Sequence, residues 1–72
     1  MNVAQPIPGS PLTPRERDVL VMVGKGFSNP EVGALLHMAR PTVNGHLKII
    51  YAKLEVRNRV EAAKWAWEMG LL

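Results

Sequence analysis

Three helix-start signatures recur along this chain, and no other feature limits its fold as strongly. Each pairs a capping residue with a glutamate three positions later: Thr13 with Glu16, Ser28 with Glu31, and Asn58 with Glu61. Such a cap accepts a hydrogen bond from the third backbone N–H of a new helix, and the glutamate reaches back to the cap. In the first two signatures a proline stands in the first turn, where its missing N–H is tolerated. The sequence therefore predicts helices that begin near residues 14, 29 and 58.

Apolar residues at helical spacing extend these starts and add a further helix. We expect an all-α domain of four helices, at about residues 14–24, 29–36, 40–54 and 58–69. No sustained apolar–polar alternation indicates a strand. The residues expected to face the core are Val19, Leu20 and Val23, then Val32, Leu35 and Leu36, then Val43, Leu47, Ile50 and Leu54, and finally Ala62, Ala66 and Met69.

Length and composition limit the remaining possibilities. The 72 residues suffice for one small domain, and 47% of them are hydrophobic. The absence of cysteine excludes a disulfide scaffold and thiolate metal sites. Residues 1–11 hold three prolines and no charge, so we expect a flexible linker or arm there and one domain over 12–72, which hints at the C-terminal piece of a larger protein. Neither a signal peptide nor a membrane-spanning stretch is recognisable, so the cytoplasm is the expected location.

Positive charge is concentrated in one part of the chain, whose net charge is +3. In residues 40–59 only Glu55 opposes five basic residues, namely Arg40, Lys48, Lys53, Arg57 and Arg59. Outside this stretch acidic residues outnumber basic ones. This distribution is typical of a surface that meets a polyanion, although a solvated helix face would also account for it.

The second and third predicted helices have the proportions of a helix-turn-helix motif, over about residues 29–48. A short turn at residues 37–39 joins them, and His37 is a residue type that tolerates the positive φ that such a turn requires. Gly33 supplies the small residue needed where the two helix backbones approach. The pair is thus expected to pack closely and to present one side of the third helix to solvent.

On a helical wheel, the side of the third helix opposite its apolar stripe carries short side chains. Its residues are Pro41, Asn44, Gly45, Lys48 and Ala52. So slim a face suits entry into the major groove of double-stranded DNA. There Asn44 would pair with adenine, with an ordinary surface polar residue as the alternative, and Lys48 would reach guanine or a phosphate. The predicted contacts to the DNA backbone are Arg40, Thr42, Lys53, Arg57 and Arg59, with pairing to nearby carboxylates as the alternative for the last two.

From Leu12 to Leu72 the chain resembles the LuxR/NarL-type helix-turn-helix domain, the C-terminal output module of many bacterial response regulators and quorum-sensing regulators. The matching residues are Leu12-Thr13-Pro14-Arg15-Glu16, Gly26-Phe27-Ser28-Asn29, Glu31-Val32, Leu36, Thr42-Val43, His46, Ile50, Lys53-Leu54, Val56, Asn58-Arg59 and Glu61-Ala62. The resemblance implies a four-helix fold, sequence-specific promoter binding as a dimer through the fourth helix, and base contacts from Asn44, Gly45 and Lys48. The chain departs from the family where Asn44 replaces a lysine, Ala39 a serine cap and Gly33 an alanine.

The fourth predicted helix carries more apolar surface than a thin helix buries on one side. We expect Val60, Ala63 and Trp67, together with Lys64, to form a homodimer interface on DNA. Folding of Trp65 or Trp67 back onto the small core is the alternative. RNA polymerase is a further candidate partner of such a domain.

Two other classes of function are weaker. A helix-turn-helix that docks a polymerase subunit or partner regulator would use the apolar fourth helix but would leave the clustered cations unexplained. An enzyme is disfavoured because His37 and His46 have no third ligand at metal spacing, and no phosphate loop or nucleophile arrangement is present. We therefore expect no cofactor, no metal and no small-molecule ligand in this domain, and we interpret His46 as a packing residue.

Overall fold

The computed structural model describes residues 11–72, so nearly all of the predicted linker lies outside the described residues. Its four helices are α1 (Pro14–Gly24), α2 (Asn29–Leu36), α3 (Arg40–Leu54) and α4 (Arg59–Glu68). Residues 11–72 contain no strand. The predicted all-α fold is confirmed, and α4 is shorter than expected by one residue at each end because Asn58 and Met69 serve as its caps.

Hydrogen bonds at the helix starts explain why the boundaries were predictable. Thr13 Oγ1 accepts from the backbone N–H of Glu16, whose carboxylate accepts from the N–H of Thr13 in return, and Ser28 and Glu31 repeat this arrangement. The start of α4 differs. Asn58 Oδ1 accepts from the N–H of Glu61 at 2.9 Å, but the Glu61 carboxylate accepts from the N–H of Arg57, one residue before the cap.

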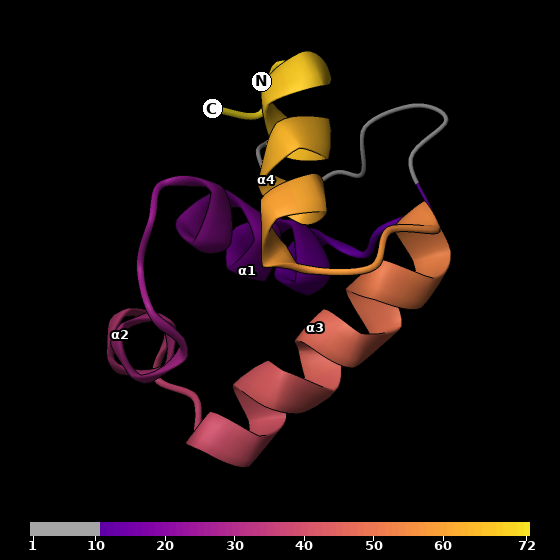
Figure 1. The fold of residues 1–72 in the computed structure, drawn as a ribbon. Helices are drawn as coiled ribbons and strands as arrows, with labels where there is room; N and C mark the ends of the chain where they lie inside the picture. Colours follow the sequence, from indigo (N-terminus) through magenta and orange to yellow (C-terminus); the bar gives the residue numbers. More distant parts are fainter. Residues whose placement is uncertain (1–10) are drawn as a thin grey trace.

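The core lies where α1 meets the other three helices. In Figure 1, α4 stands upright beside α1, while α3 runs along the lower edge of the fold from α2 towards the segment that leads to α4. The fully or nearly fully buried apolar residues are Leu12, Val19, Leu20, Val23, Val32, Val43, Leu47, Ile50, Ala62 and Ala66. All of them except Leu12 were predicted from helical spacing, whereas Leu36 and Leu54 pack against this core only partly buried.

Two residues expected in the core are not there. Leu35 is 51% exposed, and Met69 is 49% exposed. On α2 the buried arc runs through Val32 and Gly33, because α3 approaches the helix on the glycine side. Leu35 lies on the other side of Val32 and is therefore left in solvent. Met69 is the C-cap of α4, beyond the last turn that packs on α1.

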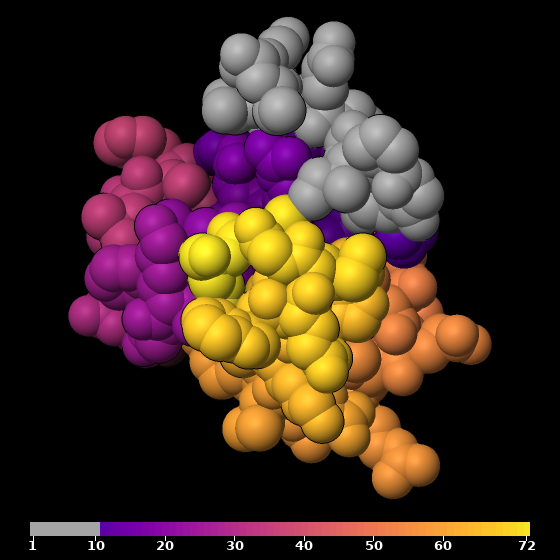
Figure 2. All heavy atoms as spheres, turned by 90° about the horizontal axis from the view of Figure 1, so that it is seen from above, coloured from indigo at the N-terminus to yellow at the C-terminus, as the bar shows by residue number. Residues whose placement is uncertain are grey.

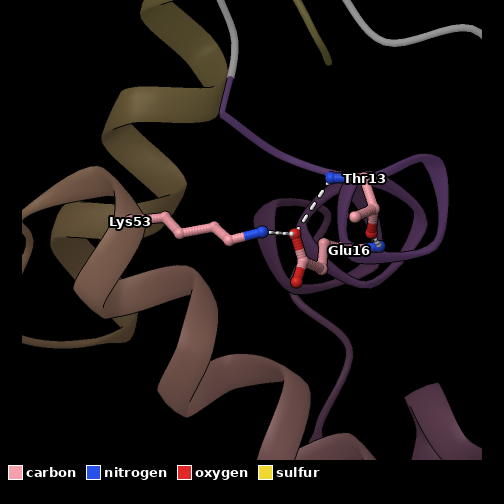
Figure 3. A network of polar contacts seen from close by, with 3 residues as sticks. All are labelled: Thr13, Glu16 and Lys53. Carbon is pink, nitrogen blue, oxygen red and sulfur yellow. Dashed lines mark hydrogen bonds and ion pairs between the residues drawn. The ribbon is translucent and has the colours of Figure 1, made fainter.

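A buried carboxylate links the first helix to the third (Figure 3). Glu16 Oε1 lies 2.8 Å from the Nζ of Lys53 and 2.9 Å from the backbone nitrogen of Thr13. Burial by itself raises the pKa of Glu16, but the hydrogen bonds from Lys53 and Thr13 outweigh it and hold that pKa below its ordinary value. The ionised carboxylate is therefore the form that stabilises the fold.

Replacing Glu16 with glutamine is expected to lower the free energy of unfolding at pH 7 by about 1 kcal/mol, because the capping box survives while the charge facing Lys53 is lost. A group whose pKa is lowered on folding contributes stability above its unfolded pKa and loses it in acid. The difference between the two proteins should therefore shrink as the pH falls below about 4 and vanish once the pH is below the lowered pKa of Glu16 in the folded protein. Urea unfolding at pH 7 and pH 3 measures it, and a difference that persists in acid would contradict the assignment.

Candidate nucleic-acid interface

One side of α3 is anchored and the other is open. Val43, Leu47 and Ile50 are buried against the rest of the domain. Every residue of the predicted slim face is exposed, namely Pro41, Asn44, Gly45, Lys48 and Ala52. Apart from the neighbouring backbone of α3 itself, no described atom lies within 4 Å of the position that a Cβ on Gly45 would take. Neither α4 nor any other described segment therefore covers this face, which a helix must keep bare to approach base edges.

The turn between α2 and α3 fixes the angle at which that face is presented. The N–H of Met38 donates to the carbonyl oxygen of Gly33 at 2.8 Å, and a Cβ built on Gly33 would lie only 2.6 Å from the carbonyl oxygen of Met38. His37 adopts the left-handed conformation expected of it, with φ 58°. The glycine is thus required by the close approach of the two segments, as the sequence suggested.

The predicted DNA-backbone contacts differ in their surroundings. Arg40, Thr42 and Arg57 are exposed, as phosphate contacts would be. Lys53 is held by the carboxylate of Glu16. The guanidinium of Arg59 points back into the protein. It donates to the carbonyl oxygen of Phe27, before α2, and to the side-chain oxygen of Asn29, in the first turn of α2, rather than to the carboxylates considered above. The outward positive charge is therefore carried by fewer side chains than predicted.

Asn44, the first of the predicted base readers, has a partner that the sequence did not indicate. Its Oδ1 accepts a hydrogen bond of 2.8 Å from the Nδ2 of Asn29, the first residue of α2. Asn29 Oδ1 in turn accepts from Nη1 of Arg59 at 2.7 Å. These residues are 15 and 30 positions apart, so no local pattern could have revealed the connection.

The outer side of α4 is strongly apolar. Val60 is 77% and Trp67 71% exposed, with Ala63 half-buried between them and Lys64 exposed. Trp65, by contrast, is half-buried and packs against the core, so of the two tryptophans only that one folds back. Figure 2 views the molecule from the α4 end, where the yellow atoms of this helix lie at the centre of the face.

Other kinds of site find little support in residues 11–72. No three histidine, cysteine or acidic side chains gather there in a way that could hold a metal ion. No described helix is both long enough and apolar enough to cross a bilayer. His37 is exposed and His46 is half-buried. Hydrogen bonds from Ser28 hold the pKa of Glu31 below its ordinary value.

Comparison with known proteins gives a consistent result. A family model described as bacterial regulatory proteins of the luxR family matches residues 10–66. The response regulator protein VraR of Staphylococcus aureus strain Mu3 is 38% identical over 61 residues, or 85% of this chain, and the VraR proteins of Staphylococcus saprophyticus and Staphylococcus epidermidis match equally well. The matched region is only 29% of the length of these relatives.

Proposed function

Because the chain belongs to the luxR family of bacterial regulatory proteins, we propose that residues 12–72 bind a specific sequence of double-stranded DNA as part of a transcription regulator. The helix-turn-helix is the segment from α2 to the middle of α3, about residues 29–48. In this proposal α3 enters the major groove, and the domain performs no catalysis.

The observation that carries the proposal is the asymmetry of α3. Its apolar side is completely buried at Val43 and Ile50, while its opposite side is exposed and bears only short residues and Lys48. A groove about 12 Å wide admits such a helix, whereas a bulky outer face would hold the backbone away from the bases. The base-reading residues are Asn44, Gly45 and Lys48.

Phosphate contacts are assigned to three residues around this face that are exposed and whose side chains have no acidic partner among residues 11–72, namely Arg40, Thr42 and Arg57. Lys53 and Arg59, which the sequence also suggested, serve instead to hold α3 to α1 and α4 to α2. Three exposed cations, Arg40, Lys48 and Arg57, thus remain close to the DNA in this arrangement.

DNA selection from a random library, followed by binding measurements at several salt concentrations, tests the proposal. We expect one enriched motif, and an affinity that falls with log salt at a slope of about −3 per protomer, from three cations that each displace a counterion. A slope near zero with no enriched motif would contradict DNA binding. That result would instead favour the second candidate, a module that docks a polymerase subunit or partner regulator through apolar contacts.

We further propose that two copies bind neighbouring half-sites through the outer side of α4. Val60, Ala63, Lys64 and Trp67 recur at helical spacing and form one surface, whose two largest apolar side chains are mostly exposed. An exposed tryptophan and valine at this spacing are typical of an interface. Pairing of two copies would give half-sites about one helical turn of DNA apart.

Replacing Trp67 with glutamate is expected to abolish the preference for paired over single half-sites while the fold stays intact, because the side chain is 71% exposed in the monomer. A gel shift measures the occupancy of a DNA with paired half-sites and of a DNA with a single half-site, and the ratio of the two occupancies is the preference. Leu35→Glu makes the same kind of change on α2, where the leucine is 51% exposed, and should leave that ratio unchanged. Equal effects of the two variants would refute the interface, and unfolding of the Trp67 variant would place this side chain in the core.

A further inference from the structure

Three side chains from three helices form a continuous hydrogen-bonded relay that ends at the DNA-reading face. Arg59, the first residue of α4, donates through Nη1 to Asn29 Oδ1 at 2.7 Å. Asn29, the first residue of α2, donates through Nδ2 to Asn44 Oδ1 at 2.8 Å. Asn44 lies in the second turn of α3, on the exposed slim face.

The chemistry of these groups fixes the direction of the relay. A guanidinium has only donors, so the atom of Asn29 that faces Arg59 must be its oxygen. The remaining end of the Asn29 amide is then its NH₂ group, which requires an acceptor, and the atom of Asn44 that meets it must be an oxygen too. Arg59 is itself held by a second bond to the carbonyl oxygen of Phe27, so the start of the relay is anchored at two points.

We propose that Arg59 and Asn29 are positioning residues that make Asn44 read DNA through donors alone. The bond from Asn29 turns the Oδ1 of Asn44 towards α2, so the end of the amide left for the DNA is Nδ2, with both of its N–H groups. This inference rests on the proposed function and replaces the pairing with adenine expected from the sequence, because that pairing uses the oxygen and the nitrogen of the amide together.

The base that fits such a group follows from the major-groove pattern. Guanine presents two acceptors, O6 and N7, to an NH₂ group. Adenine presents one acceptor beside an NH₂ of its own, thymine one acceptor beside a methyl group, and cytosine a donor. Asn44 therefore selects guanine over adenine at the position it reads, by about fivefold or more, the lower end of what a good base contact contributes.

Asn29→Asp tests the relay by reversing its direction. An aspartate still accepts from Arg59 but has no donor for Asn44, so the amide of Asn44 turns to donate to the new carboxylate and leaves its oxygen for the DNA. An acidic residue is also favourable in the first turn of a helix, so the fold is retained. Library selection with the wild type, Asn44→Ala and Asn29→Asp identifies the position read by Asn44 and its base preference in each protein.

The expected result is guanine at that position for the wild type, no preference for Asn44→Ala, and a change to adenine or cytosine for Asn29→Asp. Lys25→Ala, at the exposed C-cap of α1, is the charge control for Arg59→Ala. Both variants lose one positive charge, but only Arg59→Ala should relax the base preference. An unchanged preference in Asn29→Asp, or adenine in the wild type, would overturn the relay while leaving DNA binding in place. Absence of any binding by the wild type at low salt would overturn the proposed function itself.

Discussion

Replacing Gly33 with alanine is expected to lower the free energy of unfolding by about 1–2 kcal/mol, although alanine is the better helix former. The new methyl carbon would lie 2.6 Å from the carbonyl oxygen of Met38, a backbone atom that cannot turn aside. Overpacking of this kind costs about 1–3 kcal/mol, against a gain of up to about 1 kcal/mol in helix propensity. The steric cost is the larger of the two effects, so we expect a net loss.

Gly45→Ala is the matched control, because it makes the same substitution in the interior of a helix where no atom lies within 4 Å of the new carbon. It should raise the free energy of unfolding by about 1 kcal/mol. The two variants would then differ by about 2–3 kcal/mol, which corresponds to roughly 10–20 °C in melting temperature for a domain of this size. If both variants are stabilised, the close approach of α2 to the turn before α3 is wrong.

Lys48→Glu is expected to weaken DNA binding roughly 100-fold, the largest effect of any single substitution on the slim face. The lysine is exposed on the face assigned to the groove, so the change removes a donor and places a negative charge beside bases and phosphates. A loss of about 3 kcal/mol is the upper range for one base contact and corresponds to that factor. Fluorescence anisotropy with the selected DNA measures it directly.

The control for this experiment is Lys25→Glu, which alters the net charge equally. Lys25 is exposed at the C-cap of α1, outside the α3 face. The Lys25→Glu variant should weaken binding only through the long-range electrostatic field of the protein. Salt at 0.1 M screens this field within about 10 Å. If the two lysine variants lose affinity equally, Lys48 contributes to the overall charge but does not contact the DNA.

The helix boundaries could be predicted because the signals that set them are local. Thr13 and Ser28 each bond to a glutamate three residues away, and such pairs are visible in any sequence. The burial of Val43, Leu47 and Ile50 followed from helical spacing in the same way. The exposure of the slim face followed as well, since it lies opposite that stripe on the same helix.

What the sequence did not predict depends on contacts between distant residues. Leu35 has the spacing of a core residue, but the direction from which α3 approaches leaves it exposed. Lys53 and Arg59 were read as phosphate contacts because they are basic, yet their partners lie 37 and 30 residues away. Asn44 was assigned to adenine because an isolated asparagine offers both a donor and an acceptor, and only the fold shows that Asn29 has engaged the acceptor.

The way α4 is attached has a consequence for the motions of the domain. Its only fully buried side chains are the methyl groups of Ala62 and Ala66, and of its two tryptophans Trp65 is half-buried against the core while Trp67 lies outside. Small buried side chains contribute less free energy than large ones, so we expect α4 to open locally at a lower free-energy cost than global unfolding. A second copy resting on Trp67 would suppress these openings, and because Arg59 is part of the same helix, it would also hold the start of the relay in place. Assembly and sequence reading would then be thermodynamically linked, each strengthening the other.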